Sequence, residues 1–158
     1  MGKILKKLLI TGGAGFIGSN VARRLLSDGF EITILDNFLP QIHGDLNELS
    51  SDLKDRVKLI VGDVANKSVL YSALQGQDAV IHYAAETGTG QSMYAVSHYT
   101  NVNIQATANL CDFIINENHQ IKNVIVASSR SIYGEGKYNS PQHGIVYPNS
   151  RTFQNVQE

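Results

Sequence analysis

The sequence predicts an α/β fold: a doubly wound parallel sheet of about five strands with helices on both faces, incomplete at its C-terminal end. Short apolar runs alternate with longer amphipathic runs along the chain, and this alternation is typical of strands joined by crossover helices. The short runs are almost continuously apolar, as expected of parallel strands that are covered on both faces. These two observations predict the fold class.

Five short apolar runs are predicted strands. They are LLIT (8–11), EITILD (31–36), VKLIVGD (57–63), DAVIHYAA (78–85) and NVIVASS (123–129). Apolar residues that recur at helical spacing predict helices over residues 16–29, 68–76 and 92–119. The pattern ends after Ser129, and residues 130–158, rich in Gly, Pro, Asn, Ser and Gln, are predicted to form a loop.

The composition is that of an ordinary globular domain. The chain has 158 residues, of which 42% are hydrophobic and 17% charged, and its formal net charge is −1. This balance provides no electrostatic footprint for nucleic acid or an acidic membrane. Cys111 is the only cysteine, so an internal disulfide is excluded and a cytoplasmic setting is expected. Four histidines lack the spacing of metal ligands, and no metal site is expected: His43, His98, His119 and His143.

A glycine-rich stretch, TGGAGFIG (11–18), lies between the first predicted strand and the first predicted helix. It satisfies G-x-G-x-x-G with Gly13, Gly15 and Gly18, and T-G-x-x-G-x-x-G from Thr11 onward. A pyrophosphate can approach the backbone only where β carbons are absent, and the start of the helix offers it free N–H groups and positive charge. The stretch predicts a Rossmann-type dinucleotide site. The alternative is a glycine-rich turn that serves packing only.

Two acidic residues follow later strands. Asp36 ends the second predicted strand, 18 residues after Gly18, where an acid can bind the adenosine ribose hydroxyls and repel a 2′-phosphate. Asn37 follows it rather than arginine, so NAD is predicted over NADP; the alternative role for Asp36 is a cap in the next loop. Asp63 ends the third strand, and either contact with adenine or a cap for the helix near Asn66 explains it.

Six stretches of the chain together resemble one known family. They are TGGAGFIG, LDN at 35–37, GDV at 62–64, IHYAA at 81–85, NIQAT at 103–107 and SSRSIYG at 128–134. From residue 7 to about 137, their order and spacing resemble the extended short-chain dehydrogenase/reductases, in particular the NAD-dependent nucleotide-sugar epimerases and dehydratases. PQIHGD, AAETGTGQSMY and ASSRSIYGEGKY are most similar to dTDP-L-rhamnose 4-epimerase-type members.

The resemblance implies cofactor-binding roles at the matching positions. The residues implied to hold the pyrophosphate are Gly12, Gly15, Phe16, Ile17 and Gly18. Asp36 and Asn37 are implied to bind the adenosine ribose, and Asp63 and Val64 to flank the adenine. Ala84 and Ala85 are implied to line the rest of the cofactor cleft. Asn103 would brace the fourth strand, unless it is only an amide on the helix surface. Ala106 stands where the family has Gly, and a small packing change is expected.

The resemblance also implies substrate and catalytic roles. Thr87 and Ser92 fall where family members touch the sugar or the nicotinamide. Ser129 matches the catalytic Ser or Thr; Ser128 is the alternative for the hydroxyl that faces the substrate, and position favours Ser129. His82 is expected to be a strand histidine with a satisfied hydrogen bond rather than a catalytic group.

Tyr133 and Lys137 have the spacing of the family's acid/base pair, in which a Lys one helical turn away makes the Tyr more acidic. Two of the three residues between them are Gly134 and Gly136, each costing about 1 kcal/mol in a helix. The segment also comes directly off a predicted strand. Tyr133 is therefore expected to be the structural Tyr of the family's Tyr-Gly pair, and this chain alone is expected to lack the catalytic pair.

The chain is thus predicted to hold a partial NAD-binding Rossmann domain over residues 1–137. Residues 138–158 are predicted to be a loop or disordered tail that leads to an absent catalytic helix and substrate domain. In the full-length protein an NDP-sugar would be the substrate, and epimerisation or dehydration through transient hydride transfer to NAD the reaction. The expected assembly is a homo-oligomer, with neither nucleic acid nor a membrane as partner.

A non-catalytic NAD(P)-binding module that senses redox state or binds a partner is the alternative function. A general carbonyl reductase is disfavoured by the spacing between Ser129 and any Tyr-Lys pair. The gene beyond codon 158 distinguishes the first two: a Y-x-x-x-K in a helical pattern, followed by a further domain, favours the enzyme, and a stop codon favours the module or a shortened remnant. Without later strands, the fifth strand is expected to be an open edge that self-associates, or to precede a disordered tail.

Overall fold

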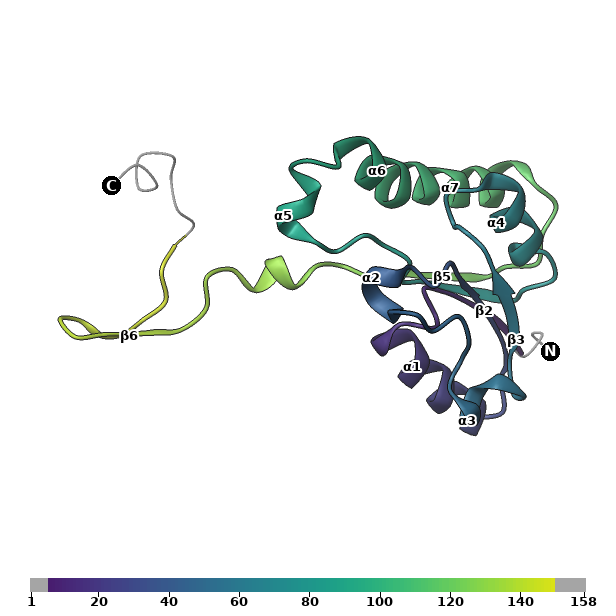
Figure 1. Ribbon diagram of the computed structural model, residues 1–158, viewed down its shortest axis with the longest axis horizontal. Helices are drawn as coiled ribbons and strands as arrows, with labels where there is room; N and C mark the ends of the chain where they lie inside the picture. Colours follow the sequence, from purple (N-terminus) through teal and green to yellow (C-terminus); the bar gives the residue numbers. More distant parts are fainter. Residues whose placement is uncertain (1–5, 150–158) are drawn as a thin grey trace. The chain divides into compact units, whose positions relative to one another are not determined.

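The computed structural model describes residues 6–149, and the chain divides into two compact units, residues 1–127 and 128–158. The larger unit contains a five-stranded sheet with the helices that cover it (Figure 1). The smaller unit contains a short 3-10 helix and a two-stranded hairpin.

The larger unit is built on a parallel sheet with the strand order β3-β2-β1-β4-β5. Its strands are β1 (Lys7–Thr11), β2 (Glu31–Asp36), β3 (Lys58–Val61), β4 (Ala79–His82) and β5 (Asn123–Val126). The chain winds outward from β1 to β3 in one direction and from β4 to β5 in the other. This order confirms the predicted doubly wound sheet. It also places a switch point between β1 and β4, and such sheets bind ligands at the switch point.

The fourth and fifth strands end earlier than predicted because the carboxyl edge of the sheet is level. β1 ends at Thr11, which pairs with His82 in β4, and His82 in turn pairs with Val126 in β5. Beyond Thr11 the chain turns into the glycine-rich stretch, so β4 has no neighbour past His82 on that side. The residues that follow His82 and Val126, predicted as strand, are therefore loops of the carboxyl edge.

Helices cover both faces of the sheet, as predicted (Figure 1). They are α1 (Phe16–Ser27), α2 (Pro40–His43), α3 (Ser51–Lys54), α4 (Lys67–Leu74), α5 (Thr89–Ser92), α6 (Val96–Thr100) and α7 (Ala106–Asn116), with a π-helical turn, η1 (Asn101–Gln105), between the last two. Successive residues of β1 point to opposite faces. Leu8 and Ile10 enter a core with α1 and α3, and Leu9 enters a second core with α4 and α7.

The helix predicted over residues 92–119 is interrupted in the structure. Ala95, with φ −102° and ψ 42°, leaves the helical region between α5 and α6. From Val96 to Asn116 the chain is continuously helical, but it passes through the wider turn η1. A π-helical turn holds an extra residue and is frequent at functional sites. α2 and α3 were not predicted, because four residues are too few to show a helical period.

The smaller unit differs from the loop predicted after Ser129. A 3-10 helix, η2 (Arg130–Tyr133), is followed by an antiparallel hairpin of β6 (Tyr138–Ser140) and β7 (Gly144–Val146). The hydroxyl of Ser140 accepts the N–H groups of Gln142 and His143, both at 3.3 Å, and so stabilises the turn of the hairpin. Strands of three residues are too short to show an alternating pattern. The part of the predicted tail from residue 150 onward lies outside the described residues.

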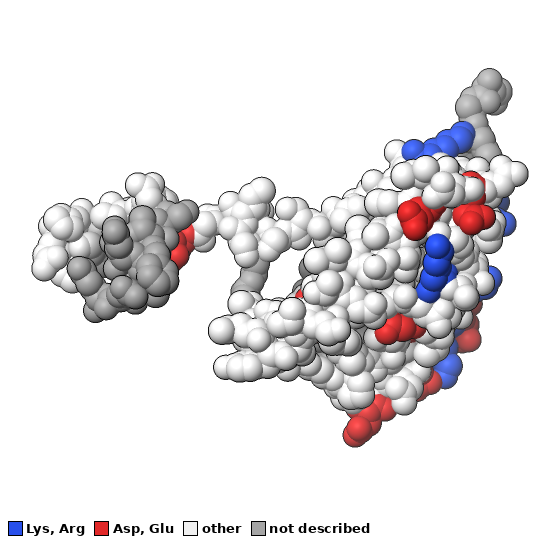
Figure 2. All heavy atoms as spheres, turned by 90° about the horizontal axis from the view of Figure 1, so that it is seen from above, with Lys and Arg blue, Asp and Glu red and all other residues white. Residues whose placement is uncertain are grey.

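Charged side chains of both signs are interspersed on the face of the larger unit that Figure 2 shows. Residues 87–111, which span α5, α6 and η1 and the start of α7, contain no Asp, Glu, Lys or Arg. Within residues 6–149, no helix combines the length and the apolar character needed to cross a membrane. Charge is thus sparse over one group of helices and balanced elsewhere on this face.

The edge strand β5 exposes apolar side chains. All four of its residues are exposed, and Val124, Ile125 and Val126 are 41%, 54% and 54% accessible to solvent. Exposed apolar strands at a sheet edge are templates for pairing with another chain. The open edge expected from the sequence is therefore present, and self-association through it stays a prediction.

We expect the chain to self-associate as its concentration rises, and Ile125→Lys to shift it toward the monomer, because a charge on an edge strand opposes pairing. Since Ile125 is 54% exposed, the substitution should change the free energy of unfolding by less than about 0.5 kcal/mol. Sedimentation velocity over a concentration series measures the association. Ile42→Lys, at a 57% exposed position in α2, is the control and should leave it unchanged. A wild-type chain that stays monomeric throughout contradicts the prediction.

Candidate functional site

The glycine-rich stretch turns sharply as it leaves β1. Gly12 has a φ of +67°, a conformation that favours glycine, and its N–H donates to the carbonyl of Leu35 (2.8 Å). A β carbon on Gly12 would lie 2.8 Å from the backbone nitrogen of Ala84, and one on Gly18 would lie 2.5 Å from the carbonyl oxygen of Gly12. Packing within the fold therefore requires glycine at both positions.

Gly15 is different, because its surroundings leave room for a side chain. Its φ is −67°, which any residue adopts, and a β carbon there would lie 3.4 Å from the carbonyl oxygen of Gly12, an ordinary contact. Packing alone accounts for Gly12 and Gly18 but leaves Gly15 unexplained. A ligand that approaches the backbone at the start of α1 accounts for it.

The start of α1 provides donors for an anion. The N–H of Ser19 donates to the carbonyl of Gly15 (2.9 Å), so the N–H groups of Phe16, Ile17 and Gly18 precede the first bond of the helix. They carry the positive end of the helix dipole. The side chains of Phe16 and Ile17 are 86% and 63% exposed, so they flank this turn instead of entering the core. The structure thus brings the residues predicted for the pyrophosphate into one turn.

Asp36 joins the glycine-rich stretch to the exit of β2. Its side chain is buried, and its carboxylate accepts the N–H of Ala14 and the N–H of Phe38, each at 3.0 Å. The bond from Phe38 is the local turn that the sequence offered as an alternative role. The bond from Ala14 also ties this carboxylate to the glycine-rich stretch, and contact between Asp36 and a ribose stays a prediction.

His43, at the end of α2, also approaches this carboxylate. Its Nε2 lies 3.5 Å from Asp36 Oδ1, and its ring packs against Phe38 with 5.1 Å between the ring centres. No pattern in the sequence assigned His43 to the site. The one available signal is Pro40, which is favoured at the first position of a helix. The predicted neighbour Asn37 is exposed, and its side-chain oxygen accepts the N–H of Leu39 (3.2 Å).

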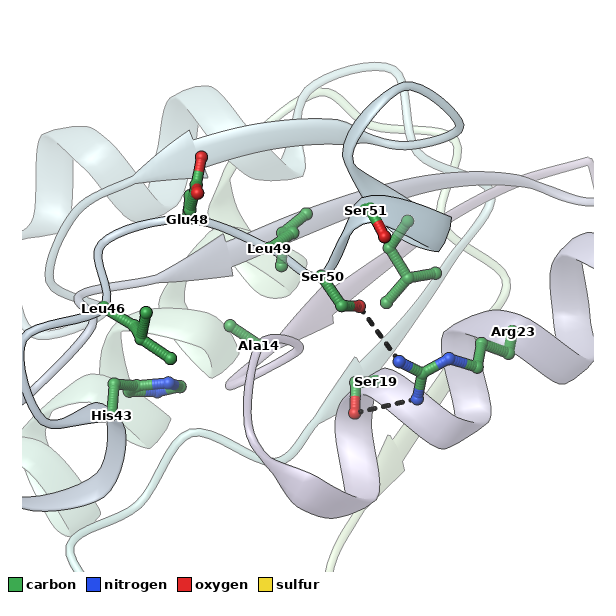
Figure 3. A pocket seen from close by; sticks show the side chains of 10 residues that line it. Ala14, Ser19, Arg23, His43, Leu46, Glu48, Leu49, Ser50 and Ser51 are labelled. Atoms are coloured by element: carbon green, nitrogen blue, oxygen red, sulfur yellow. Dashed lines mark hydrogen bonds between the residues drawn. The ribbon is translucent and has the colours of Figure 1, made fainter.

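A cavity of about 370 Å³ opens beside the glycine-rich stretch (Figure 3). Ala14, Ser19, Arg23, His43 and the segment around residues 46–53 line it. The guanidinium of Arg23 donates to Ser50 Oγ (3.0 Å) and forms two hydrogen bonds with the carboxylate of Asp52, at 2.6 and 3.3 Å. The bond from Arg23 lowers the pKa of Asp52, so the pair of opposite charges persists below the pH at which an ordinary aspartate is protonated.

At the exit of β3 the structure separates the two roles considered for Asp63. Asn66 caps α4, because its side-chain oxygen accepts the N–H groups of Ser68 (3.1 Å) and Val69 (3.3 Å). Asp63 instead accepts the N–H of Ala65 (2.8 Å). The alternative in which Asp63 caps α4 is therefore wrong. Val64, also predicted beside adenine, has its side chain in the core and is 5% exposed, so only its backbone is available to a ligand.

The exit of β4 carries a buried histidine. His82 is 4% exposed, and its ring nitrogens contact Thr11 Oγ1 (2.8 Å) and Thr107 Oγ1 (3.3 Å). The expectation of a strand histidine with a satisfied hydrogen bond is confirmed. Burial lowers the pKa of His82, which keeps the imidazole neutral.

Asn103, in the π-helical turn, holds the loop after β4. Its side-chain oxygen accepts the N–H of Glu86 (2.8 Å), and its amide donates to the carbonyl of Glu86 (3.0 Å). The alternative of a helix-surface amide without a role is therefore wrong. A direct contact between Asn103 and a cofactor stays a prediction.

The remaining residues predicted along this loop differ in exposure. Ala84 is half-buried and donates its N–H to Thr11 Oγ1 (3.2 Å), whereas Ala85 and Thr87 are exposed. Ser92 donates its hydroxyl to the carbonyl of Thr89 (2.7 Å) inside α5. Ala84 thus lies against the glycine-rich stretch, and the polar groups farther along face solvent or their own helix.

Ser129 begins the 3-10 helix of the smaller unit. Its hydroxyl accepts the N–H of Ser131 (3.1 Å), and the residue is exposed. Tyr133 ends that helix, and Lys137 follows two glycines with positive φ, Gly134 (70°) and Gly136 (84°). Tyr133 and Lys137 therefore do not share a helix, as expected. A catalytic role for Ser129 stays a prediction.

The four strand exits from β1 to β4 place the candidate cofactor residues at one edge of the sheet. Neighbouring parallel strands end at the same edge of the sheet. Along this edge the order, from β3 to β4, is Asp63, Asp36, the glycine-rich stretch and Ala84. Among residues 6–149, no group of three or more His, Cys, Asp or Glu side chains could hold a metal ion. The arrangement suits an extended ligand with an anionic centre.

Comparison with known proteins agrees with this arrangement. The model of the NAD dependent epimerase/dehydratase family matches residues 8–152. The chain belongs to this family. The resemblance seen in the six sequence stretches is therefore confirmed.

Relatives in the epimerase/dehydratase family act on nucleotide sugars, as their names state. dTDP-L-rhamnose 4-epimerase of Burkholderia thailandensis is 37% identical over 148 residues, which are 92% of this chain and 40% of that protein. A bifunctional UDP-glucose and UDP-xylose 4-epimerase of Pisum sativum is 32% identical over 82% of this chain and 38% of its own length. The chain thus spans about two fifths of these relatives.

Solved structures of epimerases share the fold. UDP-glucose 4-epimerase from Bifidobacterium longum, in complex with NAD+ and UDP, superposes with a TM-score of 0.65 at 27% identity, over 82% of this chain and 38% of that one. UDP-N-acetylglucosamine 4-epimerase from Methanobrevibacter ruminantium superposes with a TM-score of 0.66 at 32% identity, over 87% and 41%. The predicted Rossmann-type sheet is confirmed by these neighbours.

We expect Gly18→Ala to lower the free energy of unfolding by about 1–3 kcal/mol, because its β carbon would lie 2.5 Å from a backbone oxygen that cannot move freely. Gly15→Ala is the matched control in the same turn and should lower it by less than about 1 kcal/mol, since its β carbon fits. Urea unfolding followed by circular dichroism measures both. Equal losses would show that the two glycines have the same structural role.

Proposed function

We propose that this chain is the NAD-binding part of a nucleotide-sugar epimerase or dehydratase. The observation that carries the proposal is the turn at the start of α1, where Gly15 has room for a side chain yet remains glycine, beside free N–H groups. When bound, NAD supplies a hydride acceptor. The chain's own part is to hold the pyrophosphate at Gly12–Gly18, the ribose at Asp36 and Asn37, and the adenine beside Asp63 and Val64.

The electrostatics near Asp36 favour NAD over NADP. Asp36 Oδ2 accepts the N–H of Ala14 and retains a lone pair for a ribose hydroxyl, whereas Oδ1 accepts the N–H of Phe38 and lies 3.5 Å from His43 Nε2. A 2′-phosphate close to this carboxylate would be repelled. Arg23, which lines the neighbouring cavity, is already paired with Asp52 and offers little uncompensated positive charge. The absence of an arginine directly after Asp36 supports the same assignment.

We expect the chain to bind NAD at least about tenfold more tightly than NADP, and Asp36→Asn to weaken NAD binding and narrow that ratio. The reason is that an uncharged amide accepts a weaker hydrogen bond from a ribose hydroxyl than a carboxylate does, and it no longer repels the 2′-phosphate of NADP. Isothermal titration calorimetry measures the dissociation constants of the NAD and NADP complexes. Asp45→Asn, an exposed acid shortly after α2, is the control and should leave both unchanged. A wild-type preference for NADP would contradict the assignment.

The chemistry of the full-length protein is proposed to take place on an NDP-sugar. Thr87 and Ser92 are the proposed sugar contacts, and Ser129 is the proposed donor to the reacting oxygen. The required Tyr-Lys pair on one helix is not formed by Tyr133 and Lys137. A cytoplasmic location and a homo-oligomer complete the proposal. The alternative is a non-catalytic NAD(P)-binding module, which the same cofactor site would serve.

We expect the purified chain to give no turnover above background with NAD and a panel of dTDP- and UDP-sugars, because a Tyr without a nearby Lys stays protonated at neutral pH and cannot take the proton of the sugar hydroxyl. Product formation is measured by chromatography of the nucleotide sugars after a stopped incubation. A full-length family member run in parallel is the positive control. Turnover by this chain would contradict the proposal that it lacks the catalytic pair.

A further inference from the structure

A continuous chain of hydrogen bonds crosses the larger unit from the start of the cofactor cleft to α7. The N–H of Ala84 donates to Thr11 Oγ1 (3.2 Å), which contacts His82 Nδ1 (2.8 Å). On the other side of the ring, His82 Nε2 contacts Thr107 Oγ1 (3.3 Å), whose hydroxyl donates to the carbonyl of Asn103 (2.9 Å). Thr11 and His82 are buried, at 0% and 4% exposure.

The direction of each bond in this chain follows from the number of hydrogens available. Thr107 has one hydroxyl hydrogen and gives it to the carbonyl of Asn103, so toward His82 it can only accept. Nε2 must therefore carry the ring proton. A neutral imidazole has one N–H, so Nδ1 is an acceptor, and the hydroxyl of Thr11 must donate to it. Thr11 Oγ1 then accepts from Ala84, and every polar atom of the chain has a partner.

We propose that His82 is held as the neutral Nε2–H tautomer and acts as a positioning residue that fixes Thr11 and Ala84 at the floor of the cofactor cleft. The positioning role rests on the proposed NAD site. Ala84 is the residue whose backbone meets Gly12 so closely that a β carbon would lie 2.8 Å from its nitrogen. A small rotation of Thr11 or of the Ala84 peptide would therefore move Gly12.

Other protonation states of His82 leave a buried hydrogen without an acceptor. With a proton on Nδ1, Thr11 would have to accept from both His82 and Ala84, and its own hydroxyl hydrogen would lose its acceptor. Thr11 is fully buried, so a water molecule cannot replace the lost acceptor. The depressed pKa of His82, which burial causes, agrees with a neutral ring. The network therefore admits one arrangement of hydrogens.

Nitrogen-15 NMR of the imidazole tests the tautomer in the absence of any cofactor. In the 158-residue chain we expect His82 Nε2 to have the shift of a protonated nitrogen and Nδ1 that of an unprotonated one, at neutral pH. Thr107→Val keeps the shape of the side chain but removes the acceptor, so both shifts should move toward the average of two tautomers. Thr107→Ser keeps the hydroxyl and should preserve the wild-type shifts. An Nδ1–H tautomer or a doubly protonated ring in the wild-type chain would overturn the proposal.

NAD titration of the same variants tests the positioning role. We expect Thr107→Val to raise the Kd for NAD about tenfold, the effect of losing one hydrogen bond that orders the site, and Thr107→Ser to leave it within about twofold. Thr107 lies on α7 and has no proposed contact with the cofactor. Because Thr107→Val also removes the bond to the carbonyl of Asn103, a weaker NAD affinity is assigned to His82 only where the nitrogen-15 shifts of His82 change with it. Amide spectra of both variants check that the fold is kept.

The outcomes separate this inference from the proposed function. If Thr107→Val binds NAD as the wild type does, His82 does not position the cleft and the proposal is overturned. If the wild-type ring shows the expected tautomer but the chain takes up no NAD, the hydrogen-bond chain is supported and the NAD assignment fails. Weaker binding by Thr107→Val, with recovery in Thr107→Ser, supports both.

Discussion

The close approach of Gly12 to the backbone of Ala84 is the constraint on which the rest of the cofactor site depends. Because β1 and β4 are adjacent at the switch point of the sheet, their exits meet, and only glycine fits between them. The glycine-rich stretch is thereby turned toward β2, where Asp36 receives the N–H of Ala14. The start of α1 is then aimed along the carboxyl edge. One steric contact thus sets the direction of the helix that would face the pyrophosphate.

Asp36 carries out a structural task, and its proposed selection of the dinucleotide would use the same carboxylate. It holds two backbone N–H groups that belong to different loops, and it lies 3.5 Å from the imidazole of His43. A buried acid with such partners is held in one orientation, which is what a residue that selects among dinucleotides requires. The neighbouring Arg23–Asp52 pair leaves the cavity beside it without a strong net charge. Selectivity at this end of the cleft would then depend on Asp36.

Local features of the site could be predicted from the sequence, whereas its tertiary contacts could not. Gly12, Gly15 and Gly18 lie within seven residues of one another, and Asp36 is placed by the length of a single helix and strand, so spacing was informative. The bond between His82 and Thr107 joins residues 25 apart, and Thr107 follows a π-helical turn that no periodicity indicates. His43 reaches Asp36 only because α2, four residues long, begins at Pro40. The capping of α4 by Asn66 rather than Asp63 depended on a helix boundary shift of three residues, which patterns do not resolve.

The π-helical turn η1 sets the rotational phase between two parts of one helix. An α-helix advances about 100° per residue, so one extra residue in a turn rotates everything after it by roughly that angle relative to everything before it. With the insertion, Asn103 meets the backbone of Glu86 while Leu110 and Phe113 enter the core. The wide turn therefore joins the part of the helix that holds the loop after β4 to the part that packs in the hydrophobic core.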